Sequence, residues 1–181
     1  VTKRVGDALA RVGVAVPAAG LGRRMGGVRK PFLELAGKPV LLRSLSPFLA
    51  EPRVTAIAIS VTREELDNQP EWLTDLDKRI VIVEGGATRG ASVACAIAAL
   101  PDDVTEIAVH DGARPLVAPE VISRCIDVAR TGVGAVAGEP MIDTVKRVDK
   151  EDFVTATTDR STLWSAHTPQ VFPAMMLRNA Y

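Results

Sequence analysis

The sequence Val12-Gly-Val-Ala-Val-Pro-Ala-Ala-Gly-Leu-Gly22 joins an apolar run to a loop of small residues. Residues 12–16 predict a strand buried on both faces, because every position in the run is apolar or small rather than every second one. Residues 17–22 predict a loop whose backbone approaches a ligand closely, since glycine and alanine leave the main-chain amides accessible. In an open α/β sheet, ligands bind beyond the carboxyl ends of the strands, where this loop is expected.

Strand-like and helix-like segments alternate along most of the remaining chain. Further strands are expected at 54–61, 80–83, 106–109 and 134–137, and helices at 39–49, 62–78, 92–100 and 118–130. This order predicts one α/β domain with a Rossmann-like, doubly wound and mostly parallel sheet. The pattern changes at Asp143, where two β-prone runs, 144–148 and 153–157, predict a hairpin. We expect it to form an arm over about residues 143–165 that projects from the sheet and is available to a partner subunit.

Charge and composition limit the classes of function. The chain has 181 residues, with 22 basic and 22 acidic ones, so its formal net charge is zero. A general electrostatic attraction to nucleic acid or to a membrane surface is therefore not expected. No apolar run approaches the ~18 residues of a membrane span, and residues 1–12 lack the apolar centre of a secretory signal. The sequence favours a soluble cytoplasmic protein that binds neither nucleic acid nor membranes.

Three cations lie close to the glycine loop: Arg23, Arg24 and Lys30. A triphosphate is a dense anion and departing pyrophosphate develops further charge, so fixed cations here would stabilise the transition state of a nucleotidyl transfer. Counted from Gly20, the third glycine of a dinucleotide-binding fingerprint would fall at Met25, and no P-loop lysine motif follows. The alternative interpretation is a simple turn with solvated cations.

A second glycine-containing loop, Glu84-Gly-Gly-Ala-Thr-Arg-Gly-Ala-Ser92, follows the predicted strand at 80–83. Paired glycines with a nearby serine suit the approach to a flat base, whose edge the backbone would read. The alternative is an ordinary strand-to-helix loop in which Thr88 or Ser92 lies near the helix start.

A third loop, His110-Asp-Gly-Ala-Arg-Pro115, ends another predicted strand. Asp111 can bind a sugar hydroxyl or a Mg²⁺ ion carried by the triphosphate, and Arg114 can hold a phosphate. The alternative is an Asp111–Arg114 pair that only shapes the loop. We interpret His110 as structural, and no serine lies in the G-x-S-x-G motif that a hydrolase triad would need.

Taken in order, these motifs resemble the methylerythritol phosphate cytidylyltransferases of the sugar nucleotidyltransferase superfamily. The resemblance runs from Val12 to about Phe172. It rests on Pro17-Ala-Ala-Gly-x-Gly-x-Arg-Met, Lys30-Pro, Gly85-Gly, His110-Asp-x-Ala-Arg-Pro, Asp143-Thr-x-Lys, Asp159-Arg and Thr168-Pro-Gln-x-Phe.

The resemblance implies transfer of CMP from CTP to 2-C-methyl-D-erythritol 4-phosphate with release of pyrophosphate, in non-mevalonate isoprenoid biosynthesis. It implies Mg²⁺ or another divalent cation as cofactor, and Arg24 and Lys30 as catalytic residues. The expected nucleotide-binding residues are Pro17, Ala18, Ala19, Gly20, Gly22, Gly85, Gly86 and Ser92. Asp111, also a candidate metal ligand, and Arg114 would bind substrate. Thr144 and Arg160 on the arm would reach the acceptor held by a second subunit of a homodimer.

Two features depart from the family pattern. Ala87 stands where many relatives carry a polar or acidic residue beside the base. The family also continues beyond the position of Tyr181, with a late strand whose lysine faces the phosphates, so we expect that C-terminal part of the domain to be missing here. Two alternatives therefore remain at this stage: a ribitol 5-phosphate cytidylyltransferase, and a shortened non-catalytic nucleotide-binding relative.

Overall fold

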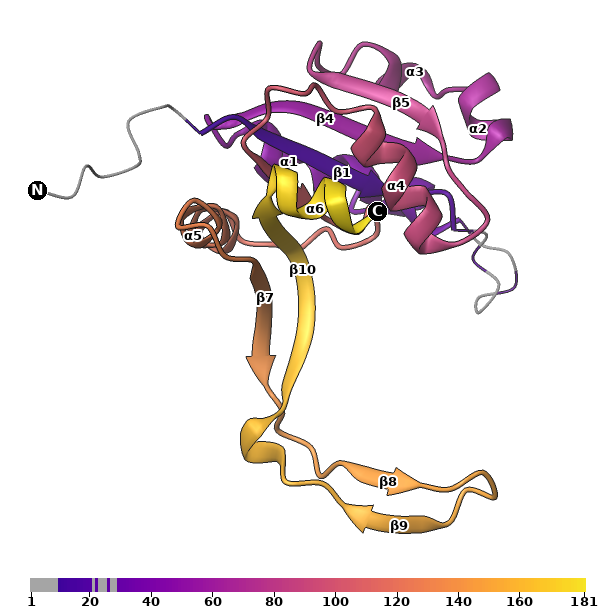
Figure 1. Cartoon of the computed structure of the whole chain (residues 1–181). Helices are drawn as coiled ribbons and strands as arrows, with labels where there is room; N and C mark the ends of the chain where they lie inside the picture. The colour runs from indigo at the N-terminus through magenta and orange to yellow at the C-terminus, as the bar shows by residue number, and fades with distance from the viewer. Residues whose placement is uncertain (1–9, 21, 23–25, 27–28) are drawn as a thin grey trace, which may run out of the picture.

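The computed structural model describes residues 10–20, 22, 26 and 29–181. Their centre is a six-stranded sheet in the order β5-β4-β1-β6-β10-β7 (Figure 1). The strands are β1 (Val12–Pro17), β4 (Val54–Val61), β5 (Ile80–Glu84), β6 (Glu106–Val109), β7 (Ala135–Pro140) and β10 (Trp164–Pro173). Pairs β1–β4, β1–β6 and β4–β5 are parallel, whereas β10 runs antiparallel to both neighbours. The prediction of a mostly parallel α/β sheet is confirmed.

Helices cover both faces of this sheet (Figure 1). One layer holds α1 (Val40–Leu49) and α5 (Pro119–Ala129), and the other holds α4 (Arg89–Ala98) and α6 (Ala174–Ala180). Strand β1 sends Val12, Val14 and Val16 into the first core and Ala15 into the second. An all-apolar run is therefore what this strand needs, because neither of its faces meets water.

The segment 62–78 is not the single helix that the sequence predicted. It forms α2 (Arg63–Asp67) and α3 (Glu71–Thr74), separated by a break before Pro70. Proline disfavours the helical conformation of the preceding residue and has no N–H to donate, so the first helix ends before it. A short turn of 3-10 helix, η2 (Lys30–Phe32), and a small hairpin of β2 (Glu34–Leu35) and β3 (Lys38–Pro39) precede α1.

The chain between β7 and β10 forms a projection that leaves the body at one end of the sheet (Figure 1). Its outer part is an antiparallel hairpin of β8 (Lys146–Val148) and β9 (Val154–Thr157), and η3 (Arg160–Thr162) leads back to β10. The sequence did not predict β10 or α6. Pro169 argues against a central strand because it cannot donate to the ladder, and the β10–β7 register shifts between Ala166 and Gln170 to accommodate it.

The order of the strands creates a crevice beside β1. From β1 the chain moves outward through β4 and β5, and it then returns to place β6 on the opposite side of β1. The loops that follow β1 and β6 therefore diverge, and this reversal is where ligands bind in open α/β sheets. No helix within the described ranges combines the length and the apolar character that a membrane crossing requires.

Candidate active site

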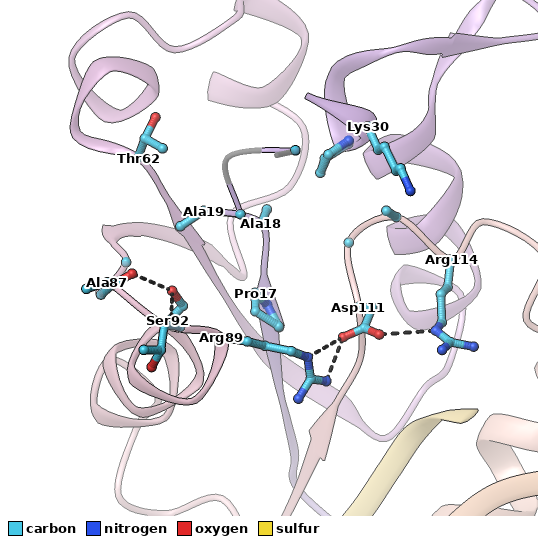
Figure 2. A pocket seen from close by; sticks show the side chains of 18 of the residues that line it. Pro17, Ala18, Ala19, Lys30, Thr62, Ala87, Arg89, Ser92, Asp111 and Arg114 are labelled. Atoms are coloured by element: carbon cyan, nitrogen blue, oxygen red, sulfur yellow. Dashed lines mark hydrogen bonds and ion pairs between the residues drawn. The ribbon is translucent and has the colours of Figure 1, made fainter. Parts of the chain in front are cut away.

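A cavity of about 800 Å³ opens at this reversal of strand order, at the carboxyl ends of β1, β5 and β6 (Figure 2). It gathers the three loops that the sequence singled out. The predicted site residues that line it are Pro17, Ala18, Ala19, Gly20, Gly22, Lys30, Gly85, Gly86, Ser92, Asp111 and Arg114. Segments nearly a hundred positions apart in the chain thus meet around one space large enough for a nucleotide.

The loop after β1 is fixed at Ala18 from two sides. The amide of Ala18 donates to the carbonyl of Ser60 at the end of β4, at 2.8 Å. Its carbonyl accepts from Nη2 of Arg29 at 2.9 Å. Beyond it, a Cβ added to Gly20 would meet no atom of the described residues within 4 Å. Gly22 has a φ of 61°, a conformation that suits glycine.

Arg29, which the sequence analysis missed, connects this loop to α2. Its Nη2 also lies 2.6 Å from Oε2 of Glu65. Glu65 closes a capping box with Thr62, since its carboxylate accepts from the amide of Thr62 at 3.0 Å. A Thr-x-x-Glu sequence is a recognisable helix start. It marks the beginning of α2, but nothing in it points to Arg29.

The loop after β5 packs tightly against the start of α4. A Cβ on Gly85 would lie 2.5 Å from Cβ of Ala19 and 2.9 Å from Oγ of Ser92, and one on Gly86 would lie 2.4 Å from Cβ of Ala91. Ser92 donates within the same turn, to the carbonyls of Gly86 and Thr88 at 3.1 and 3.0 Å. Both glycines are therefore required by close packing, and this packing brings the loop to the cavity wall (Figure 2).

The loop after β6 carries Asp111, whose two carboxylate oxygens are held by different arginines (Figure 2). Oδ1 accepts from Nε and Nη2 of Arg89 at 3.0 and 2.6 Å, and Oδ2 accepts from Nε of Arg114 at 3.1 Å. The Asp111–Arg114 pair that the sequence left open is thus present. Arg89 was not predicted, because an arginine in the first turn of a helix has no distinguishing pattern.

His110 holds this loop from inside the core. Its Nε2 lies 3.1 Å from the carbonyl of Arg114, which can only accept, so Nε2 carries the proton. Nδ1 then accepts from the Thr168 hydroxyl at 3.0 Å, and that hydroxyl accepts from the amide of Asp111 at 3.3 Å. Burial, which includes packing on Phe48, lowers the pKa of His110 to about 4. The neutral imidazole shapes the loop, as the sequence analysis expected.

The charges around the cavity suit a polyanion. Lys30, Arg63, Arg89 and Arg114 line it, and Arg63 is paired with Glu84 outside the lining. Asp111 is the one acidic side chain among the described residues that line the cavity. An excess of fixed cations in a partly enclosed site attracts phosphate groups and stabilises the charge that develops on them.

With one acidic side chain among the described lining residues, the site would suit a Mg²⁺ ion that is bound mainly by the phosphates of the nucleotide. The described residues contain no cluster of three or more His, Cys, Asp or Glu side chains that could hold a metal. Mg²⁺ in nucleotide enzymes is commonly bound through one or two carboxylates together with substrate phosphates and water. Asp111 is the candidate protein ligand here, and a metal ion would have to compete for it with the two arginines that already bind its oxygens.

Two of the predicted site residues are not among those that line the cavity. Thr144 and Arg160 belong to the projection between β7 and β10, where Nη1 of Arg160 donates to the carbonyl of Ile142. Arg24 lies outside the described residues. The roles of these three residues stay predictions.

Comparison with known proteins agrees with this geometry. The family model described as 2-C-methyl-D-erythritol 4-phosphate cytidylyltransferase matches residues 12–181. A protein of that name from Parasynechococcus marenigrum is 40% identical over 169 residues, which cover 92% of this chain and 74% of the relative. Another from Dehalococcoides mccartyi is 40% identical over 173 residues, covering 94% and 76%.

Solved structures give the same result for the fold. The 4-diphosphocytidyl-2C-methyl-D-erythritol synthase of Anaerococcus prevotii superimposes with a TM-score of 0.81 at 25% identity, over 94% of this chain and 73% of that one. The 2-C-methyl-D-erythritol 4-phosphate cytidylyltransferase of Thermus thermophilus does so with a TM-score of 0.72 at 28% identity, over 94% and 73%. With its cavity, loops and sequence in agreement, the chain belongs to the 2-C-methyl-D-erythritol 4-phosphate cytidylyltransferase family.

Proposed function

We propose that the chain transfers CMP from CTP to 2-C-methyl-D-erythritol 4-phosphate, as a step of isoprenoid biosynthesis. A phosphate oxygen of the acceptor attacks the α-phosphorus of CTP and forms a new P–O bond. The bond from the α-phosphorus to the oxygen that bridges to the β-phosphate breaks, and pyrophosphate leaves with the electron pair. The products are the CDP-linked polyol and pyrophosphate, so all atoms and charges are accounted for.

The observation that carries this proposal is the meeting of the three predicted loops around one cation-rich cavity. The loops after β1 and β5 expose small residues and main-chain groups, which suits a nucleoside. Lys30 lies across the cavity from Ala87 and Ser92 (Figure 2), so a base at the latter pair would direct its phosphates toward the lysine. Ala87 offers only its backbone to the base, which leaves main-chain groups and Ser92 to bind it.

The geometry matches the demands of the chemistry. A phosphate monoester is already ionised near neutral pH, so the nucleophile needs no strong general base. His110 is buried and neutral and bonds to protein groups through both nitrogens, so it is not available as one. What remains is to position two polyanions and to neutralise their repulsion. In the proposal, Lys30 and Arg24 hold the triphosphate, and Mg²⁺ would supply further neutralisation with Asp111 as its protein ligand.

A homodimer joined through the arm is part of the proposal. Thr144 and Arg160 lie on this arm, which is the projection between β7 and β10 (Figure 1). They are not among the described residues that line the cavity of the same chain. The projection also exposes large apolar side chains, with Ile142 79% and Phe153 71% exposed. A second copy would cover such side chains and could receive the two polar residues at its own cavity. A cytoplasmic location stays a prediction.

Pyrophosphate release from CTP tests the proposed reaction. The samples contain Mg²⁺ and either 2-C-methyl-D-erythritol 4-phosphate, ribitol 5-phosphate or no acceptor. We expect release that depends on the methylerythritol acceptor and falls at least about 100-fold in Lys30→Ala, because a cation aimed at a developing charge contributes about that much. Preference for ribitol 5-phosphate would change the proposed acceptor. CTP binding without release under any condition would favour a non-catalytic relative.

A further inference from the structure

Both histidines of the chain hold Arg114, one at its main chain and one at its side chain. His110 bonds to the Arg114 carbonyl, whereas Nδ1 of His167 lies 2.9 Å from Nη1 of the guanidinium. Nε2 of His167 lies 3.1 Å from Oε1 of Glu139. These contacts form a chain from Glu139 on β7, through His167 on β10, to Arg114 at the cavity.

The partners of His167 determine where its proton lies. A guanidinium only donates hydrogen bonds, so the Nδ1 that faces Arg114 accepts and carries no proton. A carboxylate only accepts, so the Nε2 that faces Glu139 carries the proton. Glu139 therefore favours the tautomer that presents a lone pair to Arg114. Carboxylates that accept a hydrogen bond from the other ring nitrogen of a functional histidine act in the same way in other proteins.

Two anchors fix the plane of the Arg114 guanidinium. Nε is held by Asp111 and Nη1 by His167. Neither of these bonds uses Nη2, and Arg114 lines the cavity with a side chain that is 44% exposed. Because a guanidinium is rigid and planar, fixing two of its nitrogens sets the direction in which the third presents its N–H groups.

We propose that His167 is a positioning residue for the transfer reaction, with Glu139 setting its tautomer, and that together they aim Arg114 at the phosphate of the acceptor. The identity of that phosphate rests on the proposed function, whereas the His167 contacts do not. The side chains of His167 and Glu139 are 35% and 63% exposed, so their pairing contributes little to folding. Substitution of His167 should therefore change substrate binding more than stability.

The tautomer is measured by ¹H–¹⁵N NMR of the imidazole groups in the full chain. With two histidines present, His167→Gln assigns the signals by removing one set. We expect the Nε2-protonated tautomer for His167 in the unsubstituted chain, and a weaker preference in Glu139→Ala, where only the Arg114 contact still requires an unprotonated Nδ1. Glu120→Ala, which removes an exposed carboxylate from the first turn of α5, is the matched control and should change neither histidine.

Kinetics of the same variants test the positioning role. His167→Leu should raise the KM for the acceptor about tenfold, the value of one net hydrogen bond to a charged group, with the KM for CTP unchanged. His167→Gln keeps one acceptor and one donor and should remain within about twofold of the parent. Thermal unfolding of each variant confirms that it is folded.

Three results would overturn the proposal: an Nδ1-protonated His167, an unchanged acceptor KM in folded His167→Leu, or an equal rise in the KM for CTP. The tautomer is read without turnover. A chain that does not use the methylerythritol acceptor would thus contradict the proposed function, while the spectra would still decide the His167 contact.

Discussion

Arg89 reaches from α4 to Asp111 at the end of β6, and two of its nitrogens, Nε and Nη2, lie 3.0 and 2.6 Å from the same oxygen, Oδ1. Arg114 occupies the other oxygen. Both oxygens of the carboxylate that the sequence offered as a metal ligand thus accept hydrogen bonds from arginines. A cation that uses Asp111 has to compete with an arginine for it.

This competition predicts the effect of Arg89→Met on the metal requirement. If Mg²⁺ binds Asp111 during the reaction, removal of Arg89 should lower the Mg²⁺ concentration for half-maximal activity by about two- to fivefold, since partly exposed ion pairs contribute up to about 1 kcal/mol. The measurement is a Mg²⁺ titration of pyrophosphate release. Arg63→Met removes another cavity arginine that is paired with Glu84 rather than Asp111, and it should leave the midpoint unchanged. Equal midpoints in all three chains would show that Arg89 and the metal do not share Asp111.

A side chain at Gly85 should clash with the loop after β1, whereas one at the nearby Gly90 should not. Gly85→Ala places a Cβ 2.5 Å from Cβ of Ala19, so the loops after β1 and β5 must separate. We expect a loss of about 1–3 kcal/mol of unfolding free energy and weaker CTP binding. Gly90→Ala, in the first turn of α4, meets only Oγ1 of Thr88 at 3.9 Å and should be neutral or stabilising by up to about 1 kcal/mol. Urea unfolding and CTP titration compare the two variants, and equal stability would contradict the packing argument.

We expect the stability of the protein to depend on pH, because burial lowers the pKa of His110. Its pKa falls from 6.5 to about 4 in the folded protein, chiefly through burial. Between these values the unfolded chain binds a proton that the folded chain does not, so the free energy of unfolding rises with pH across this window and this contribution levels off above it. The contribution lost on acidification is about 3 kcal/mol. His110→Asn should remove this one-proton slope. Urea unfolding between about pH 4.5 and about pH 7.5 measures it, and identical slopes in both chains would contradict the assignment.

Because Arg29 binds both Glu65 and the carbonyl of Ala18, we expect it to support both the stability of the fold and the conformation of the loop after β1. Arg29→Lys retains the charge but cannot reach Glu65 and the carbonyl of Ala18 with the geometry of a guanidinium. We expect a loss of about 1–2 kcal/mol of unfolding free energy and a raised KM for CTP. The comparison variant is Arg63→Lys, whose parent side chain is 63% exposed, and it should lose less than about 0.5 kcal/mol. A KM for CTP that is unchanged in Arg29→Lys would mean that Arg29 serves only the fold.

Local pattern was sufficient for the parallel core and for the main-chain parts of the site. The run at 12–16 is apolar because both of its faces are covered, and the small residues after it mark the loop at the strand end. Local sequence pattern was not sufficient where a residue distant in the chain determines the conformation. Strand β10 contains Pro169, which local rules exclude from a sheet interior, and it is accommodated by a register shift against β7. Arg29 and Arg89 each bind a carboxylate more than twenty positions away, and Arg29 also binds the main-chain carbonyl of Ala18, so no sequence motif could identify them.

The arm can be tested by mixing two inactive chains. Lys30→Ala should damage the body of the site, and Arg160→Ala should damage the arm that a second subunit would supply. If each site combines one body with the partner's arm, a mixed dimer has one site with both defects and one site that is intact. In an equal mixture after reversible unfolding, about half of the dimers are mixed and about half of their sites are intact, so about one quarter of the parental activity should return. Recovery to that level would require the arm to act between subunits. If both chains fold and the mixture is no more active than they are alone, the arm does not complete the partner's site and Arg160 acts within its own chain.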